Sequence, residues 1–395
     1  MRIGLLGPYA SRNLGDTAIQ MTVIKNLKAR RPGVEIVGIC PEPEDTVDAL
    51  GVPAFPLDGH GPAAVPSVRG ELSQTKTVHG RKRTQNRWPA LKRIALFVRS
   101  LALVIVSGGG QLDDFWGGAW AHPFAMFTWS LLARLQGTRV AFLGVGLDRL
   151  SNPLSRFFAL SALRLANYRS FRDAGTRTAL EDLGLRAPSH LCPDLAFSLL
   201  SHAADDPLSA SPPFVVVNPI SKSTWTHGSD ARHEAYIRSL ASACDWIVER
   251  GLRVRIVCSQ HAMDRPVALR LSEAIRPQFS GKVELREVVR VTEFLAQVSG
   301  ARLVVASRLH GAILSLVMGA PVVAISPQRK VAQLMEDVGL ADYRVELQNF
   351  APADLIDRIR AALDEGPHLR QRVRERTQVF SAALSKTYDD VLSLV

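Results

Sequence analysis

One short polar segment, residues 307–311, carries the side chains best suited to chemistry in this chain. It has the sequence Ser-Arg-Leu-His-Gly and follows an apolar run at 303–306 that has the length and composition of a buried strand. An apolar pattern of helical spacing then runs to Met318, and 322–325 is typical of another strand. The pattern therefore predicts strand, helix and strand, with the polar segment at the carboxyl end of the first strand, where open parallel sheets bind ligands.

The side chains of this segment suit an anionic ligand. Ser307 is placed to cap the predicted helix, whose free N–H groups and dipole favour an anion. Arg308 adds a planar guanidinium that matches a carboxylate or a phosphate, and His310 adds a group that exchanges a proton near neutral pH. Together they predict an anion-handling active site, and a His bonded to a backbone carbonyl is the structural alternative for His310.

The elements that must position such a site begin at the N-terminus. An apolar run, a helical pattern and a second apolar run over residues 2–39 predict a βαβ unit and hence a parallel sheet. Asn13, Gly15 and Asp16 lie at the junction between the first loop and the helix. Asp16 either caps that helix or works in a cleft, where it would hold sugar hydroxyls or accept a proton. The spacing is not the dinucleotide-binding fingerprint, so NAD is not expected.

Polar residues also follow later predicted strands. Three glycines at 108–110 come after the strand predicted at 101–106, and such a run lets the backbone approach a ligand and donate N–H groups to it. Other strand ends carry Arg172 and Asp194. Arg172 is followed by Asp173, so local pairing and helix capping are the alternative to a role in binding.

The whole chain has 395 residues, which is too long for one ordinary core and predicts two domains. With 47% hydrophobic and 22% charged residues, it has the composition of a globular protein and not of a disordered one. The net charge of +11 favours anionic partners, such as phosphate-bearing substrates, acidic glycans, an anionic membrane surface or nucleic acid. A generally basic surface without a specific partner is the alternative.

The four cysteines are far apart and form no Cys-x-x-Cys pair, which favours reduced thiols in a cytosolic protein over a zinc site or disulfides. The N-terminal apolar run is too short for a signal peptide. No apolar run reaches the about 20 residues needed to cross a bilayer, so we expect any membrane contact to be peripheral.

The predicted elements give four parts: an N-terminal α/β domain at 1–200, a polar linker at 201–213, a C-terminal α/β domain at 214–370 and a helix at 371–395. Segment 58–92 is rich in Gly, Pro, Ser and basic residues and predicts a long surface loop. It would be a mobile lid, a patch for anionic lipid or a solvated insertion without a role. The two Rossmann-like parallel-sheet domains resemble the glycosyltransferase-B architecture, with a substrate cleft lined by the carboxyl ends of both sheets.

The ordered set of motifs resembles the polysaccharide pyruvyl transferase family from Gly4 to about Lys330. In chain order the motifs are Asn-Leu-Gly-Asp at 13–16, Ser-Gly-Gly-Gly at 107–110, Gly-Val-Gly at 144–146, Arg-Asp at 172–173, Cys-Pro-Asp at 192–194 and Ser-Arg-Leu-His-Gly-Ala at 307–312. The resemblance implies transfer of the enolpyruvyl-derived group of phosphoenolpyruvate onto two hydroxyls of a sugar, giving a pyruvate ketal on a cell-surface or exopolysaccharide precursor. The insert at 58–92 departs from the family pattern, as does Ser326, which stands where an aromatic residue often precedes the lysine.

The resemblance also implies roles for single residues. Arg308 and the helix start would hold one anionic group of phosphoenolpyruvate, and Arg172 and Lys330 are candidates for the other. His310 would protonate the enol carbon, and Asp16 or Asp194 would deprotonate the acceptor hydroxyl. Neither a metal nor another cofactor is expected. The expected substrate-binding residues are Asn13, Gly15, Gly108, Gly109, Gly110, Arg172, Ser307, Gly311 and Lys330.

Two other functions stay open from the sequence. A nucleotide-sugar glycosyltransferase of the same fold would need an acidic residue to grip a ribose, and Glu287 or Glu293 is placed for that. A non-enzymatic basic module would bind a membrane or nucleic acid through residues 81–93. For the enzyme, we expect a cytoplasmic location, at most peripheral at the inner face of the membrane, and no nucleic-acid partner. The expected acceptor is a sugar, and a lipid-linked sugar is one of the alternatives.

Overall fold

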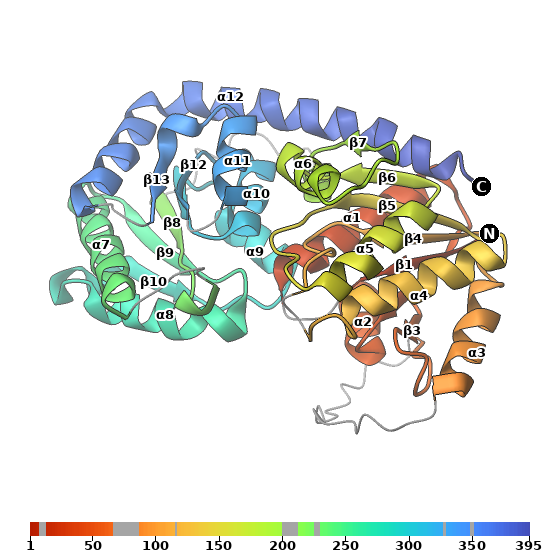
Figure 1. Cartoon of the computed structure of the whole chain (residues 1–395). Coiled ribbons are helices and arrows are strands. Elements are labelled where there is room, and N and C mark those ends of the chain that lie inside the picture. The colour runs from red at the N-terminus through yellow and green to blue at the C-terminus, as the bar shows by residue number, and fades with distance from the viewer. Residues whose placement is uncertain are drawn as a thin grey trace. The chain divides into compact units, whose positions relative to one another are not determined.

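The structure is a computed structural model of the chain and describes residues 1–7, 13–65, 87–114, 117–199, 212–224, 230–326, 329–347 and 351–395 (Figure 1). Its contacts divide the chain into two compact units. The first consists of Met1–Ser11, Ile19–Leu195 and Lys386–Val395, and the second of Arg12–Ala18 and Ala196–Ser385. Each unit is built on its own parallel sheet, and a long helix ends the chain. The predicted α/β fold class with two parallel sheets and a C-terminal helix is therefore confirmed.

The first unit contains a seven-stranded sheet in the order β3-β2-β1-β4-β5-β6-β7 with parallel pairs throughout. From β1 the chain moves outward to β2 and β3, then returns to the other side of β1 and moves outward again. The loops after β1 and β4 consequently leave in opposite directions, which makes the carboxyl ends of these two strands a topological switch point. The strands are β1 (Arg2–Leu6), β2 (Glu35–Cys40), β3 (Ala54–Pro56), β4 (Leu103–Ser107), β5 (Arg139–Val145), β6 (Tyr168–Phe171) and β7 (His190–Leu191).

Helices cover both faces of this sheet because right-handed crossovers on the two sides of β1 place them on opposite faces. The crossovers from β1 to β3 run through α1 (Leu14–Arg30) and α2 (Pro43–Leu50). Those from β3 to β6 run through α3 (Arg87–Val98), α4 (His122–Leu135) and α5 (Pro153–Leu165), and α6 (Ala174–Asp182) precedes β7.

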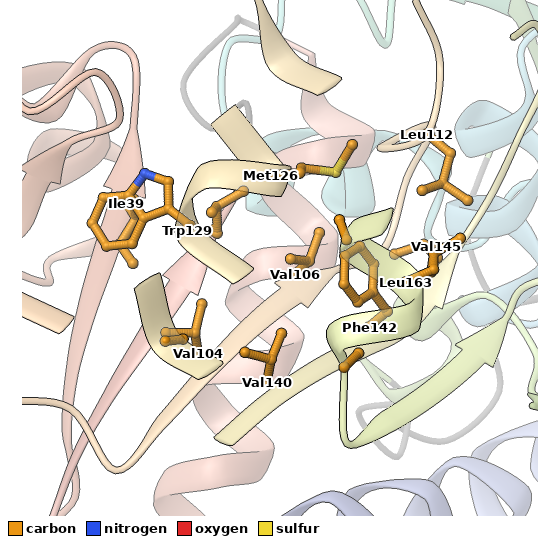
Figure 2. Packing of buried hydrophobic residues seen from close by; sticks show 14 of the residues in the cluster. Ile39, Val104, Val106, Leu112, Met126, Trp129, Val140, Phe142, Val145 and Leu163 are labelled. Carbon is orange, nitrogen blue, oxygen red and sulfur yellow. The ribbon is translucent and has the colours of Figure 1, made fainter. Parts of the chain in front are cut away.

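The core of the first unit lies between the sheet and the layer of α3, α4 and α5. Alternate strand residues such as Val104 and Val106 face this layer, as the period-2 geometry of a strand requires. Met126 and Trp129 from α4 pack against them, and Leu163 joins them from α5 (Figure 2). Burial of these side chains holds the three helices to one face of the sheet.

The second unit contains a six-stranded parallel sheet in the order β10-β9-β8-β11-β12-β13. Its switch point lies between the neighbouring strands β8 and β11. The strands are β8 (Phe214–Asn218), β9 (Arg253–Val257), β10 (Val283–Arg286), β11 (Leu303–Ala306), β12 (Val322–Ser326) and β13 (Arg344–Glu346). The helices are α7 (Asp230–Glu249), α8 (His261–Ala274), α9 (Val291–Val298), α10 (Leu309–Val317), α11 (Arg329–Asp337) and α12 (Pro352–Leu392).

The structure differs from the sequence prediction at segment 58–92. This segment is not a loop throughout, because α3 begins at Arg87 and contains Lys92 and Arg93. Arg93 Nη1 donates hydrogen bonds to the carbonyls of Gly59 (2.9 Å) and Gly61 (2.7 Å), which ties the start of the segment to the helix. The basic residues at 76–83 lie outside the described residues, as does most of the predicted linker at 201–213.

Two helices follow each other in α12, which runs from Pro352 to Leu392 and breaks at Gly366, whose φ of 44° and ψ of −108° are not helical and which Pro367 follows. The part after the break corresponds to the predicted C-terminal helix at 371–395 and begins a few residues earlier. The contact division falls within this helix, so Lys386–Val395 belongs to the first unit. In that last part Asp389 accepts a hydrogen bond from Arg30 of α1 (2.8 Å).

Candidate active site

The strongest cluster of polar side chains lies at the switch point of the second sheet. Asn218 ends β8, and Ser307 directly follows β11; the Ser307 N–H donates to the Asn218 carbonyl at 3.0 Å. The loops beyond these two residues lead to opposite sides of the sheet, so a crevice for a ligand opens at this edge in folds of this kind. The sequence predicted this location for residues 307–311.

Ser307 does not cap α10, contrary to the prediction. The N-cap position is Arg308, with φ −104° and ψ 139°, and it makes no side-chain cap bond. The Ser307 hydroxyl is instead buried 2.7 Å from the hydroxyl of Tyr236 on α7. Burial raises the pKa of the Tyr236 hydroxyl, so it stays protonated and bonds to Ser307 while it accepts the Ile220 N–H at 3.0 Å. Ser307 therefore fixes the end of β11 to α7.

Arg308 is held by a carboxylate that the sequence did not reveal. Its Nε and Nη2 donate to the two oxygens of Asp264 in α8, the Nη2 bond measuring 2.6 Å. Asp264 is fully buried and also accepts the Ser221 N–H at 2.9 Å. A two-bond pair of this kind fixes the plane of the guanidinium, whose remaining N–H groups on Nη1 and Nη2 point away from Asp264. The position of Arg308 is therefore set before any ligand binds.

Gly311 lets α10 approach β8. A Cβ at Gly311 would lie 1.9 Å from Oδ1 of Asn218, so any larger side chain would push the helix away. Asn218 is fully buried, and its Nδ2 donates to the Val257 carbonyl at 2.7 Å. Gly311 thus has a packing role, and it brings the start of α10 to the edge of the sheet.

The first turn of α1 belongs to the same cluster, although the sequence placed it in the other domain. The Leu14 N–H donates to the carbonyl of Ser259, which follows β9, at 3.1 Å. Asn13, not Asp16, caps the helix, because its Oδ1 accepts the Gly15 N–H at 3.1 Å. The prediction of Asp16 as the cap is wrong. Its carboxylate lies in the first turn of the helix and accepts a bond from Asn13 Nδ2 at 2.8 Å.

His310 packs directly on the backbone of Gly15. A Cβ at Gly15 would lie 2.0 Å from Nδ1 and 2.1 Å from Cγ of His310, well inside van der Waals contact. The His310 side chain is half-buried, and its Nε2 atom is fully buried. The contact places an imidazole from the start of α10 beside the start of α1. The Asn13–Asp16 pair and His310 are thus part of one cluster.

This cluster can bind an anion and move a proton. The N-termini of α1 and α10 supply partial positive charge, although Ser259 and the Asn13 side chain already accept the first two N–H groups of α1, and Arg308 supplies a fixed guanidinium. His310 and Asp16 supply the groups that exchange protons. The structure therefore brings together seven predicted residues, namely Asn13, Gly15, Asp16, Ser307, Arg308, His310 and Gly311.

Four supporting residues were missed by sequence reasoning. Asn218 is the last residue of β8 and Ser259 lies two residues after β9, so the rule that found Ser307 was sufficient to find them. Tyr236 and Asp264 lie within helices, where no local pattern separates a site residue from a core or surface residue.

A second polar cluster lies at the carboxyl edge of the first sheet. Gly108 and Gly109 follow β4 with φ of 54° and 66°, a conformation that favours glycine. The Gly109 carbonyl accepts the Gly146 N–H at 2.7 Å, so the glycine turns after β4 and β5 are bonded to each other. A Cβ at Gly110 would lie 2.5 Å from Asp113, which braces the next loop by accepting two backbone N–H groups. These glycines have structural roles, and their proposed contact with substrate stays a prediction.

Arg172 occupies the centre of this second cluster. It is buried, lies 3.5 Å from Asp194 and 3.7 Å from Asp173, and packs on Gly146, where a Cβ would lie 2.6 Å from its Nη2. Burial opposes the charge, but Asp194, Asp148, Asp173 and Asp113 outweigh it and raise the pKa of Arg172. The guanidinium is thus surrounded by carboxylates of its own unit. Asp194 is itself buried in this pair, and Asp173 caps α6 through the Thr176 N–H at 2.7 Å.

Lys330 is the remaining predicted site residue. It lies in the first turn of α11, beyond the end of β12, and is half-buried. Ser326, the residue that departs from the family pattern, ends β12 and is buried, and its carbonyl accepts the Leu347 N–H at 3.3 Å. A role of Lys330 in binding stays a prediction.

The described residues contain no group of three or more His, Cys, Asp or Glu side chains arranged to hold a metal ion. Among the same residues, none of the helices combines the length and the apolar character needed to cross a membrane.

The two parallel-sheet units, with polar residues at the carboxyl ends of their central strands, have a glycosyltransferase-B-like fold. Solved structures agree on the fold. UDP-GlcNAc 2-epimerase from Methanocaldococcus jannaschii superposes with a TM-score of 0.56 at 11% identity, over 92% of this chain and 93% of that one. The enzyme of the same name from Neisseria meningitidis, bound to UDP-GlcNAc, has a TM-score of 0.55 at 12% identity, over 98% and 100% of the two chains.

The chain belongs to the polysaccharide pyruvyl transferase family, which its sequence matches over residues 13–329. The matched region contains the Asn13 cap, the Arg308–Asp264 pair and His310. A similar protein is the amylovoran biosynthesis protein AmsJ of Erwinia amylovora, 25% identical over 168 residues. That match spans 41% of this chain and 40% of AmsJ. The family resemblance drawn from the motifs is confirmed.

Proposed function

We propose that this protein transfers the pyruvyl group of phosphoenolpyruvate onto two hydroxyls of a sugar, forming a pyruvate ketal on an exopolysaccharide or cell-surface polysaccharide precursor. The observation that carries the proposal is the packing of His310 on Gly15. It joins a proton-exchanging imidazole to the Asn13–Asp16 pair, at two helix N-termini and beside a guanidinium fixed by Asp264. Membership in the family supports the reaction class.

Phosphoenolpyruvate, the proposed donor, carries two anionic groups, a carboxylate and a phosphate, and both suit this cluster. The N–H groups of Arg308 that Asp264 leaves free would bind the carboxylate or the phosphate, and the helix starts would receive the other charge. A guanidinium held in advance loses little freedom on binding, so its contact strengthens the complex more than that of a mobile lysine.

The proposed reaction balances with the side chains of this cluster. His310, as imidazolium, protonates the methylene carbon of phosphoenolpyruvate, and positive charge develops on the adjacent carbon. A sugar hydroxyl attacks that carbon and loses its proton to a carboxylate, and the C–O bond to phosphate breaks. The second hydroxyl then attacks the same carbon and closes the ketal. His310 gave one proton to the methylene carbon, which becomes a methyl group, and one of the two hydroxyl protons restores it. The other hydroxyl proton leaves with phosphate.

Asp16 is the better of the two expected general bases. It lies in the first turn of α1, next to Gly15, on whose backbone His310 packs. Asp194 is buried beside Arg172 in the other unit, and pairing with a guanidinium weakens a carboxylate as a base. We therefore assign the acceptor proton to Asp16, and we assign Asp194 to holding Arg172.

Phosphate release from phosphoenolpyruvate tests the proposal, measured over a panel of lipid-linked and nucleotide-linked sugars. His310→Gln is expected to lower the rate with the active acceptor by about 100-fold or more, the usual contribution of a positioned acid. His368→Gln, which changes an exposed histidine of the same unit, is the matched control and should leave the rate unchanged. A fully active His310→Gln enzyme would refute the mechanism, and failure of every acceptor on the panel would refute the reaction.

The nucleotide-sugar alternative gains no support from its candidate ribose ligands. Both candidate carboxylates already have partners within the chain. Glu293 accepts the N–H groups of Val289 (2.9 Å) and Arg290 (3.2 Å), and Glu287 pairs with Arg265 at 2.7 Å. The similarity to nucleotide-sugar epimerases concerns the fold alone. Binding of a nucleotide-sugar in preference to phosphoenolpyruvate would reverse this ranking. The cytoplasmic location and the lipid-linked acceptor stay predictions.

A further inference from the structure

The helix layer over one face of the first sheet has an unusual charge pattern. The three helices α3, α4 and α5 together contain no aspartate and no glutamate. They and the residue after α3 do carry exposed cations, including Lys92, Arg99 and Arg134. The chain as a whole has 37 acidic residues among its 395, so their absence from three successive helices of one layer sets this face apart.

The same layer exposes large apolar side chains. Trp88 is 78% exposed and Leu96 61% exposed on α3, Leu135 is 72% exposed at the end of α4, and Phe157 is 56% exposed on α5. Scattered apolar residues are normal on a protein surface, but an aromatic and aliphatic set beside the cations of three helices without a carboxylate is not. Such a mixture is typical of surfaces that rest at the boundary between lipid headgroups and acyl chains.

The exposed residues of α3 form one stripe. Residues 88, 92, 96 and 99 follow the spacing at which side chains stack along one side of a helix. Trp88 and Leu96 therefore alternate with Lys92 and Arg99 along that side. The opposite side of the helix is buried in the core through Ala90, Ile94 and Val98.

The three helices form one continuous layer. Gln136, at the end of α4, donates to the Ala95 carbonyl of α3 at 2.8 Å. Phe127 of α4 lies 6.1 Å from the ring of Phe157 on α5. Figure 1 shows the three helices side by side over the sheet, and their inner sides share the core of Figure 2. The exposed apolar and basic side chains thus belong to a single face, which we call the α3–α5 face.

We propose that the α3–α5 face binds the surface of an anionic lipid bilayer, with Trp88 and Leu96 entering the headgroup region and Lys92, Arg99 and Arg134 contacting lipid phosphates. Charge decides between the occupants. A second copy of this chain would set the same cations against one another, with no carboxylate on these helices to pair with them. Nucleic acid would match the cations but would gain little from exposed leucines.

Flotation of the full chain with vesicles tests the proposal without either substrate, so its outcome is independent of the proposed reaction. The chain is expected to float with vesicles of phosphatidylglycerol and phosphatidylcholine, and not with vesicles of phosphatidylcholine alone. Each cation at an anionic surface strengthens binding about fivefold, so the double variant K92E/R99E should bind at least about 25-fold more weakly. The matched control K25E/K28E makes the same change at two exposed lysines of α1, on the other face of the sheet, and should bind like the native chain.

A second variant, W88S/L96S, tests the apolar contribution. It removes apolar area without changing charge, so it should weaken binding in high salt, where the electrostatic attraction is screened. Thermal unfolding of each variant controls for folding. The proposal fails if the native chain does not float, or if K25E/K28E weakens binding as much as K92E/R99E. It also fails if W88S/L96S turns a dimer into a monomer and leaves vesicle binding unchanged, because the face would then join two copies.

Discussion

Replacing Gly15 with alanine should separate the position of His310 from the stability of the fold. The new Cβ would lie 2.0 Å from Nδ1 and 2.1 Å from Cγ of His310, whereas ordinary contact begins at 3.4 Å. Either the imidazole or the first turn of α1 must therefore move by more than about 1 Å. A displacement of that size at a reacting group typically lowers the rate about 100-fold.

The effect on stability should be much smaller than the effect on rate. Gly15 lies in the first turn of α1, outside the left-handed region, so alanine is compatible with its backbone and favours the helix. Overpacking costs about 1–3 kcal/mol, and the helix preference offsets up to about 1 kcal/mol of it. We expect the free energy of unfolding in urea to fall by about 2 kcal/mol or less, with the folded state retained at 25 °C.

The assay is phosphate release from phosphoenolpyruvate with the active acceptor, with kcat and KM measured separately. We expect kcat to fall about 100-fold, with little change in KM for the acceptor, because the altered contact lies at the proposed proton donor, His310. Gly281→Ala is the matched control, since a Cβ there meets nothing within 4 Å and its φ is ordinary. A Gly15→Ala enzyme with native kcat would show that the contact does not position His310, and a chain that fails to fold would show that the contact is chiefly structural.

Three further predictions concern buried ionisable groups. Asp264→Asn removes the charge that holds Arg308 and should lower the free energy of unfolding by about 3 kcal/mol or more; a loss below about 1 kcal/mol in urea would contradict a tight pair. Arg172→Met leaves Asp194 buried without its cation and should cost a similar amount, whereas native stability with lost donor binding would make Arg172 a substrate clamp after all. Burial lowers the pKa of His122 from 6.5 to about 4. Between these two pH values the histidine is protonated in the unfolded chain and neutral in the folded chain. The free energy of unfolding should therefore fall by about 2–3 kcal/mol as the pH drops from about 6.5 towards 4, and His122→Gln should make this dependence on pH weaker. Urea titrations that give the native chain and the variant the same dependence on pH would refute the assignment.

The sequence predicted the residue types of the candidate site better than it predicted the groups to which those residues bond. Arg308 and His310 were found because a short apolar run ends directly before Ser307, and parallel sheets bind ligands at such ends. The Asn13–Asp16 junction was found because the loop after the first strand meets a helical pattern there. The capping assignments were wrong at both helices. Asn13 caps α1 and no side chain caps α10, because a helix begins where its backbone hydrogen bonds begin and local preference fixes that only to within a residue or two.

Arg172 illustrates what residue type cannot decide. An arginine at a strand end suits a phosphate as well as a carboxylate of its own protein. The structure surrounds it with the neighbouring Asp173 and with Asp194, Asp148 and Asp113, which come from three other positions in the chain. Pairing with Asp173 was an alternative open from the sequence, but no spacing rule joins the other three carboxylates, because they meet only when strands β4 to β7 pair.

The sequence alone determined the alternation of strands and helices, the two parallel sheets, and the family. Each of these depends on local periodicity or on motifs that are continuous in the chain. The tertiary structure decided that the first turn of α1 groups with the second unit, that His310 packs on Gly15 and that Arg308 pairs with Asp264. These contacts join residues far apart in the chain, and they follow from the order in which strands pair and from the space left by a missing Cβ.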